Sequence, residues 1–167
     1  MTGLSLDFSN LGPITLRLGA ATGVGAAIGL NRHLRNHPAG LRTHAVVALG
    51  AATAMLISLS LTENGSDLAA AASRTMQGIL TGIGFVGAGV VLHRNDAVGV
   101  HGLTSAASIW LVAILGIACG AGLVAPVLVA TVLVFLVLLL GGPIERICLR
   151  LFKTPSGPHE EDGSAGV

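Results

Sequence analysis

The chain has 167 residues, of which 52% are hydrophobic and only 10% are charged, and its mean hydropathy is +0.81. Because a soluble domain carries about 25% charged residues, this composition excludes an ordinary soluble enzyme. The net charge of +1 gives no strong field that would favour nucleic acid as a partner. Cys119 and Cys148 show no CxxC or Cys/His spacing, which argues against a zinc site.

Apolar segments long enough to cross a bilayer follow one another along the chain, since a span needs roughly 20 apolar residues. Met1 to Asn10 lacks the basic start of a signal peptide, so we expect the first apolar segment to be retained. The apolar stretch from Leu103 to Leu140 is too long for one crossing, and Gly120-Ala121-Gly122 divides it. The sequence predicts an all-α membrane protein, a bundle of about five transmembrane helices at residues 13–30, 43–61, 75–92, 103–120 and 124–140.

Residues 1–143 are predicted to form the transmembrane domain, because Gly141-Gly142-Pro143 follows the last apolar segment. Residues 144–167 form the remainder. Ile144 to Phe152 has apolar residues at helical spacing, which fits either an amphipathic helix on the membrane surface or a short solvated helix end. Thr154 to Val167 is rich in Ser, Gly, Pro and acidic residues, which is typical of disorder.

The connections between the predicted spans alternate in charge. The first connection, the third connection and the region after the fifth span hold seven of the nine Lys and Arg residues, at positions 32, 35, 42, 94, 146, 150 and 153. The opposite side has Asp7, Glu63, Asp67 and Arg74. The positive-inside rule therefore predicts an external N-terminus and a cytoplasmic C-terminus.

Glycines form stripes on the third segment. At 100° per residue, Gly78, Gly82 and Gly89 fall within about 40° of the helix, and Gly84 and Gly87 lie on the nearly opposite side. Small residues let neighbouring helices approach closely, so we expect this segment to be the central, closely packed helix. Comparable pairs occur at Gly19 and Gly23, Gly25 and Gly29, and Gly116 and Gly120.

The run Gly82 to Gly87 also matches the G-x-G-x-x-G pattern of dinucleotide sites. Such a site needs a preceding strand and an acidic residue about 20 positions later. Here the motif lies inside a predicted span, and no Asp or Glu occurs from Ala97 to Ile144. The sequence therefore predicts helix packing and no bound nucleotide or other cofactor.

A few polar residues lie at or near membrane depth. Arg17 is one turn inside the first span, where its side chain can reach the interface. Arg74 marks either the outer boundary of the third span or a polar vestibule. Thr104 to Ser108 supplies hydroxyls that can bond the backbone or a neighbouring helix. Trp110 lies deep enough that we expect it to pack inside the bundle.

The sequence offers little for a metal ion. No Asp or Glu falls within a predicted span, and a divalent ion such as Mg²⁺ prefers carboxylate oxygens. His33, His37 and His44 cluster near the first connection, but their spacing matches no known ligand set. We expect these histidines to face lipid headgroups rather than a metal.

Several segments in order resemble the MgtC/SapB family of bacterial inner-membrane proteins: Gly29-Leu30, Pro38 to His44, Gly82 to Gly89, Gly102 to Trp110 and Cys119 to Gly122. The resemblance covers about Ile14 to Leu140. The residues that we expect to carry the family motif and the helix packing are Gly40, Arg42, Thr43, Arg74, Gly78, Gly82, Gly84, Phe85, Gly87, Gly89, Gly102, Thr104, Ser108 and Trp110.

The resemblance implies a five-helix domain in the plasma membrane and a role in growth under magnesium limitation. It implies action through a membrane partner, such as another membrane complex or a second copy of the chain, within the lipid bilayer. A transporter or channel for Mg²⁺ or another small ion is the alternative. No paired carboxylates or nucleophile–base set supports an enzyme.

The chain departs from the family pattern at several charged positions. The family commonly has Glu-Arg-Glu after Gly-Leu, where this chain has Asn31, Arg32 and His33. Ala71 stands where an Asp is common, and His101 stands where an Arg is common. The soluble C-terminal domain of longer members is not present in these 167 residues.

Overall fold

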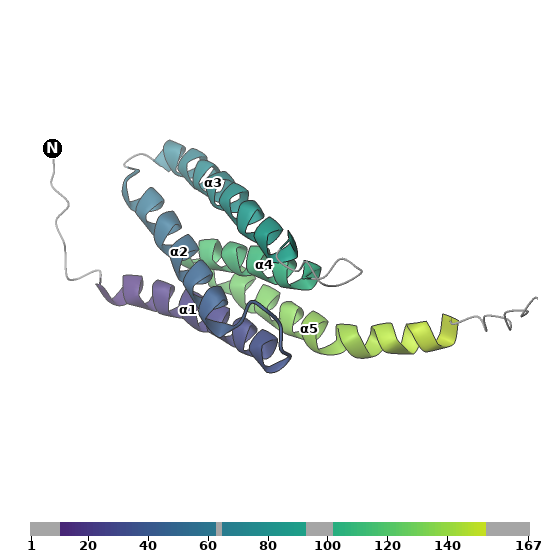
Figure 1. Ribbon diagram of the computed structural model, residues 1–167. Helices are drawn as coiled ribbons and strands as arrows, with labels where there is room; N and C mark the ends of the chain where they lie inside the picture. Colours follow the sequence, from purple (N-terminus) through teal and green to yellow (C-terminus); the bar gives the residue numbers. More distant parts are fainter. Residues whose placement is uncertain (1–10, 63–64, 93–101, 153–167) are drawn as a thin grey trace, which may run out of the picture. The chain divides into compact units, whose positions relative to one another are not determined.

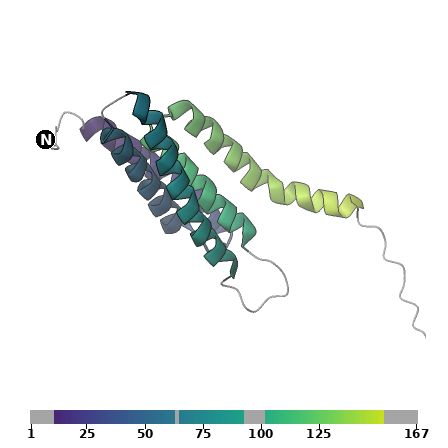
Figure 2. The same ribbon diagram turned by 90° about the horizontal axis from the view of Figure 1, so that it is seen from above.

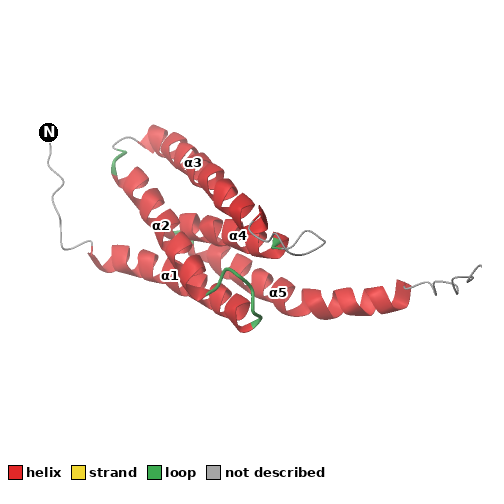
Figure 3. Ribbon diagram, in the orientation of Figure 1, coloured by secondary structure: helices red, strands yellow, loops and turns green. Residues whose placement is uncertain are grey.

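The computed structural model describes residues 11–62, 65–92 and 102–152 (Figure 1). Within these residues all regular secondary structure is helical (Figure 3), which confirms the predicted all-α fold. The helices are α1 (Leu11–Leu34), α2 (Leu41–Ser60), α3 (Gly65–Leu92), α4 (Leu103–Gly120) and α5 (Val124–Phe152). The expectations for the N-terminal ten residues, for the connection at 93–101 and for the tail after 152 lie outside the described residues.

Four of these helices, α1, α2, α4 and α5, are long and apolar enough to cross a membrane by their length and composition. The remaining helix, α3, has 28 residues, and its first half carries Asp67 and Arg74. The prediction of multiple membrane-spanning helices is therefore confirmed. A crossing by α3, and with it the count of five spans, stays a prediction.

Two of the chain reversals close with the same backbone motif. After α1, Asn36 has a φ of 57°, His37 N–H donates to Arg32 O at 3.1 Å, and Asn36 N–H donates to His33 O at 3.0 Å. After α4, Gly122 has a φ of 79° and Leu123 N–H donates to Ala118 O at 2.9 Å. A left-handed residue with these bonds is a Schellman end, which glycine favours. The break predicted at Gly120 to Gly122 is thereby explained.

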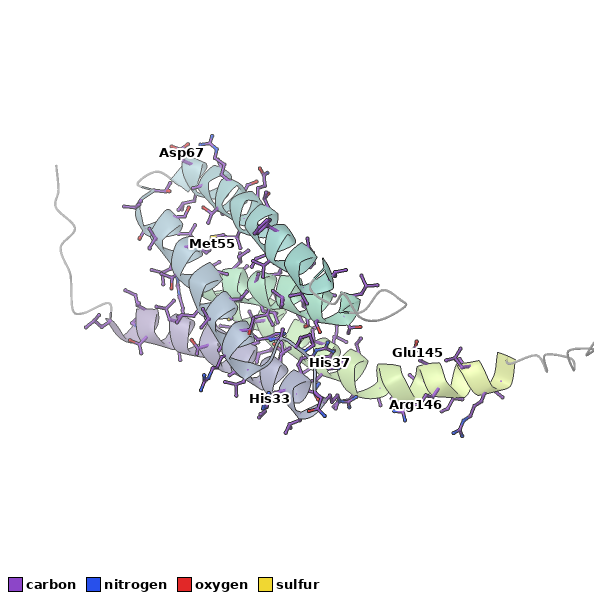
Figure 4. The ribbon with its side chains drawn as sticks, viewed as in Figure 1. His33, His37, Met55, Asp67, Glu145 and Arg146 are labelled. Carbon is purple, nitrogen blue, oxygen red and sulfur yellow. The ribbon has the colours of Figure 1, made fainter. Side chains whose placement is uncertain are left out.

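Helix α5 extends beyond the last predicted span, because it continues through Gly141, Gly142 and Pro143 to Phe152 without ending at the proline. The boundary of the transmembrane domain at residue 143 stays a prediction. A proline inside a helix removes one hydrogen bond, but membrane helices tolerate this better than helices in water. The chain divides into two compact units, residues 1–132 and 133–167. In the second unit, Glu145 and Arg146 are exposed on the last turns of α5 (Figure 4).

In the first unit, α2 and α4 are the central helices, because they pack against each other and each also packs against α1 and α3 (Figure 2). The small residues Ala48 and Ala52 form one face of α2. A Cβ on Gly116 would collide with the carbonyl oxygen of Ala48, and a Cβ on Gly120 would collide with that of Ala52. The backbones of α2 and α4 therefore touch, which only glycine at these α4 positions allows.

Helix α1 approaches α2 in the same way. A Cβ on Gly25 would lie 2.6 Å from His44 O, and one on Gly29 would lie 2.7 Å from Gly40 O. These positions and Gly116 and Gly120 are the close-packed glycine pairs. Gly19 and Gly23 of α1 have open space beside them and do not take part.

The prediction that the third segment is the central helix is wrong for this chain. Helix α3 contacts α2 and α4 only along one side, and none of its described residues is buried. Four glycines of α3 have nothing within 4 Å of an added Cβ: Gly78, Gly82, Gly84 and Gly89. Gly87 is the exception, at 3.6 Å from the Cβ of Ala106. Gly78, Gly82 and Gly89 do lie on one side of α3, but small residues on one side of a helix do not determine whether another helix packs there.

Candidate functional site

Four buried polar side chains from three helices form what we call the polar cluster. Arg32 near the end of α1 is 3% exposed, His44 in the first turns of α2 is 0% exposed, and Ser105 and Ser108 of α4 are buried beside them. Burying polar groups in an apolar bundle is unfavourable unless they bond one another. The cluster is therefore the site where this chain departs most clearly from simple apolar packing.

A chain of hydrogen bonds joins the cluster. Arg32 Nη2 donates to Ser105 Oγ at 2.7 Å, and Ser108 Oγ donates to Ser105 O at 2.8 Å. His44 Nδ1 donates to Gly40 O at 2.8 Å, since a carbonyl can only accept. His44 Nε2 lies 3.0 Å from Ser108 Oγ. Which of these two atoms donates depends on the protonation of the His44 ring.

The backbone explains why these side chains meet. His44 and Ala48 are four residues apart and so lie on one face of α2, the face that touches α1 and α4. Ser105 and Ser108 are three residues apart at the start of α4 and point to the same side. The close approach at Gly25 and Gly29 brings α1 near enough for Arg32 to reach α4.

Arg32 has no counter-charge among the described residues around it. No Asp or Glu occurs in residues 11–62 or 102–144. Asp67 lies at the start of α3, far from His33 and His37 at the other end of the bundle (Figure 4). Arg32 Nε is buried without a hydrogen-bond partner, and so is the neighbouring Asn31 Nδ2.

A second feature is an apolar groove between α3 and α4, with a volume of about 500 Å³. Its α3 side is formed by Gly84, Gly87 and their neighbours, and its α4 side by Ala107 and Trp110. Gly84 has nothing within 4 Å of an added Cβ, so no side chain of the described residues fills the groove at this point. We call it the α3–α4 groove.

The MgtC family matches residues 18–147, which is most of the chain. The chain belongs to the MgtC family. It is 44% identical to Protein SrpB of Synechococcus elongatus over 118 residues, or 66% of this chain and 64% of that protein. It is 40% identical to Protein MgtC of Salmonella typhimurium strain LT2 over 122 residues, or 73% of this chain and 49% of that protein.

Protein MgtC of Brucella suis gives a similar match, with 39% identity over 124 residues, covering 74% of this chain and 49% of that protein. The chain thus spans between about half and two thirds of the length of these relatives. No solved structure shows a significant match to the chain. Membership of the family confirms the resemblance read from the motif segments.

The structure divides the expected motif residues of the MgtC family among three places. Gly40, Arg42 and Thr43 stand at the start of α2, next to the polar cluster. Gly102 is the N-cap of α4 with a φ of 90°, where a Cβ would lie 3.0 Å from Val90 O. Ser108 belongs to the polar cluster, and Thr104 beside it is exposed.

The remaining motif residues lie on or near the α3–α4 groove or on the outer face of α3. Gly84, Gly87 and Trp110 line the groove. Trp110 is 46% exposed, so the expectation that it packs inside the bundle is wrong. Phe85 is 83% exposed on α3. Arg74 is exposed on α3, and whether it marks the outer boundary of a span or lines a polar vestibule stays a prediction.

One expectation about polar residues needs correction. His44 does not face lipid headgroups, because it is fully buried and bonded to Gly40 and Ser108. Arg17 Nη1 donates to Gly120 O at 3.2 Å, at the end of α4, and the residue is still exposed. That the Arg17 side chain reaches the membrane interface stays a prediction.

The three histidines near the first connection do not converge. His44 is buried in the polar cluster, His33 is exposed, and His37 is half-buried. No group of three His, Cys, Asp or Glu residues with metal-site geometry occurs in the part of the chain that the structure describes. Burial, followed by the charges of Arg32 and Arg35, lowers the pKa of His37 from its usual value of 6.5.

Proposed function

We propose that this chain acts in adaptation to low Mg²⁺ by binding another membrane protein through the α3–α4 groove. The observation that carries the proposal is the groove itself, an apolar hollow of about 500 Å³ that the described residues leave open. It is lined by residues from two of the segments that identify the family, Gly82 to Gly89 and Gly102 to Trp110. Small residues at such a surface let a partner helix approach closely.

The composition of the groove supports a helix as its occupant. Gly84 and Gly87 have no side chain, while Trp110 stands at the edge with nearly half of its surface exposed. A large aromatic residue beside small ones is typical of a hot spot in protein recognition. The open α3 glycines would then pack against a partner rather than against α1 or α4.

A test is to fill the groove in the intact chain. Gly84→Leu places a side chain where the chain itself leaves space, so we expect normal accumulation in the membrane. We expect this variant not to restore growth of a deletion strain at low Mg²⁺. The matched control is Gly23→Leu, because Gly23 also has nothing within 4 Å but lies on α1, away from the groove.

Two growth results would contradict the proposal. In the first, Gly84→Leu restores growth across a magnesium titration to the level reached with the parent chain and with Gly23→Leu, which would show that the groove has no role in the activity. In the second, the deletion strain grows like its parent at every magnesium concentration, which would show that the link to magnesium is wrong. Photo-crosslinking from position 107, which faces the groove, identifies the partner directly.

The alternative function, transport of Mg²⁺ or another small ion, is tested separately. The polar residues that such a path would use are Arg74, Gln77 and the hydroxyls of α4. Ser105 and Ser108 bond Arg32 and His44, and Arg74 and Gln77 are exposed on α3. Flux of Mg²⁺ into vesicles that contain the purified chain, above that of empty vesicles, would favour the transporter.

A further inference from the structure

An apolar groove with a volume of about 420 Å³ lies between one face of α1 and the first turns of α5. Its α1 side is formed by Leu16, Ala20 and Val24, and its α5 side by Val124 and Leu128. Leu16, Val124 and Leu128 are each more than half exposed. None of the extensive contacts between the described helices involves α5, so these helices leave the groove open. We call it the α1–α5 groove.

One positively charged side chain, that of Arg17, lines the groove near the start of α1. Arg17 Nη1 donates to Gly120 O at 3.2 Å, which uses one of the five N–H donors of a guanidinium group. A Cβ on Gly122 would lie 2.9 Å from Arg17 Nη2 and 3.0 Å from Arg17 Cζ. The backbone of the turn between α4 and α5 therefore holds the guanidinium group beside the apolar surface, and the bond to Gly120 leaves other donors for a ligand.

The residues around Arg17 supply no negative side chain. Residues 11–62 and 102–144 contain no Asp or Glu, and Asp67 lies at the start of α3. The end of α4 contributes about half a negative charge and the start of α5 about half a positive charge, so these two helix ends cancel each other. The net charge beside the groove is therefore close to that of one arginine, which favours a ligand with one negative charge.

The groove lies along helices whose surroundings are lipid. Both α1 and α5 are long and apolar enough to cross a membrane, and the groove follows α1 from Pro13 to Val24. At a rise of about 1.5 Å per residue, this stretch of α1 is roughly 16 Å long, which is close to half of a hydrocarbon core about 30 Å thick. The groove is therefore about as long as one leaflet is thick, and its charge stands near one end.

Charge also separates the molecules that could occupy the groove. A second copy of this chain would bring another Arg17 and no carboxylate on the same faces of α1 and α5. A lipid without a phosphate offers no negative charge, and the ammonium group of a zwitterionic headgroup offsets the charge of its own phosphate. A phospholipid with a net negative charge matches both the cation and the apolar surface.

We propose that the α1–α5 groove binds one anionic phospholipid with the chemistry of phosphatidylglycerol. The phosphate accepts hydrogen bonds from Arg17, and one acyl chain lies along Ala20 and Val24 of α1 and against the buried Val127 of α5. The proposal does not depend on the α3–α4 groove, because no residue lines both grooves.

The probes are phosphatidylglycerol, zwitterionic phosphatidylethanolamine and diacylglycerol, all with the same acyl chains. Each is titrated into the full chain purified in detergent, and binding is measured by native mass spectrometry and by the shift of the melting temperature. We expect phosphatidylglycerol to bind more tightly and to raise the melting temperature more than the other two. Because every basic residue attracts anionic lipids, the comparison between variants decides whether this groove is the site.

Two pairs of variants test the charged end and the apolar part of the groove separately. Arg17→Gln removes the cation, and its control Arg74→Gln removes an equal charge from an exposed position outside the groove. Ala20→Leu fills the groove and keeps Arg17, and its control Ala27→Leu makes the same change two turns later on the same face of α1, at an exposed position that does not line the groove. We expect Arg17→Gln to weaken binding of phosphatidylglycerol about tenfold, through the loss of a charge-assisted hydrogen bond. We expect Ala20→Leu to abolish the shift of the melting temperature, and both controls to behave like the parent chain.

Four results would overturn the proposal. In the first, phosphatidylglycerol binds no more tightly than phosphatidylethanolamine or diacylglycerol. In the second, Arg74→Gln weakens binding as much as Arg17→Gln does, so that only bulk charge is involved. In the third, Ala20→Leu binds and is stabilised like Ala27→Leu, which would show that no acyl chain lies in the groove. In the fourth, the parent chain is a dimer that Ala20→Leu converts to a monomer, which would identify a second copy as the occupant.

Discussion

Ser108 connects the two halves of the polar cluster, because its hydroxyl contacts His44 Nε2 and donates to Ser105 O. Ser108→Ala would leave His44 Nε2 buried without a partner. We expect a loss of about 1–3 kcal/mol in the free energy of unfolding, the usual cost of orphaning a buried polar group. The measurement is the unfolding free energy or melting temperature in detergent.

The matched control for Ser108 is Thr104→Ala. Thr104 also carries a hydroxyl in the first turns of α4, but its side chain is exposed. We expect this change to alter stability by less than about 0.5 kcal/mol, as is usual for surface positions. Equal losses for the two variants would mean that the buried hydrogen bond to His44 contributes nothing measurable.

His37 gives the folded chain a dependence on pH. Its pKa is lowered on folding by burial, and further by Arg32 and Arg35. The unfolded chain therefore binds this proton more readily, so stability falls as pH decreases through the unfolded pKa of about 6.5. We expect the melting temperature to fall less steeply in His37→Gln than in the parent between about pH 7.5 and pH 5.5. Parallel curves would show that His37 titrates equally in both states.

At this scale the sequence indicated the right hydroxyls but not their partners. The hydroxyls from Thr104 to Ser108 were expected to bond the backbone or a neighbouring helix, and Ser108 does both. Arg32 and His44 were missed as buried residues because charged and imidazole groups near a span end usually face water or headgroups. The only available signal was that Arg32, His44, Ser105 and Ser108 fall in or next to the family segments. Their convergence depends on the close contact of α1 with α2.

At the scale of helices, glycine pairs hold α1 and α4 against α2, and apolar side chains hold α3. Ile79 and Ile83 of α3 pack against a core that includes Met55 and Ile117. Thr75 Oγ1 also donates to Ser58 Oγ at 2.7 Å. Helix α3 therefore attaches along one side, which leaves its glycines and the α3–α4 groove open.

Glycines in contact with the backbone of another helix and open glycines of α3 should respond differently to a larger side chain, and one substitution of each kind tests this. Gly120→Leu would push α4 away from Ala52 of α2, where the backbones touch. Overpacking costs about 1–3 kcal/mol, occasionally more. Gly82→Leu adds a side chain where nothing lies within 4 Å, so we expect almost no change in the isolated chain.

Accumulation in the membrane and melting temperature in detergent measure both variants. If Gly82→Leu is as destabilising as Gly120→Leu, α3 is packed on its glycine face after all, as the stripe on the helical wheel first suggested. The sequence predicted the existence of close-packed glycine pairs correctly. It could not rank the pairs, because a small residue permits contact with a neighbouring backbone but does not require one.

At the scale of the whole molecule, charge divides the chain into two ends. Arg32, Arg35 and Arg42 lie in or next to the connection between α1 and α2. Asp67 lies at the start of α3, which Figure 4 shows at the opposite end of the first unit from His33 and His37. The all-helical fold followed from composition and from the length of the apolar segments. The predicted orientation in the membrane is argued only from this charge asymmetry, and it stays a prediction.

We expect the connection between α1 and α2 and the region after Phe152 to be cytoplasmic, and the start of α3 at Gly65 to be external, because basic residues are retained on the cytoplasmic side. Reporter fusions at Gly65 and after Lys153 should therefore give opposite signals. The charge asymmetry itself can be tested by Arg32, Arg35 and Arg42 replaced together with Gln, which should weaken the orientation preference if these residues determine it. Because the first half of α3 carries Asp67 and Arg74, a fusion after Leu92 is the decisive control. A cytoplasmic signal there together with an external one at Gly65 establishes that α3 crosses the membrane, whereas an external signal at both positions would reduce the bundle to four spans.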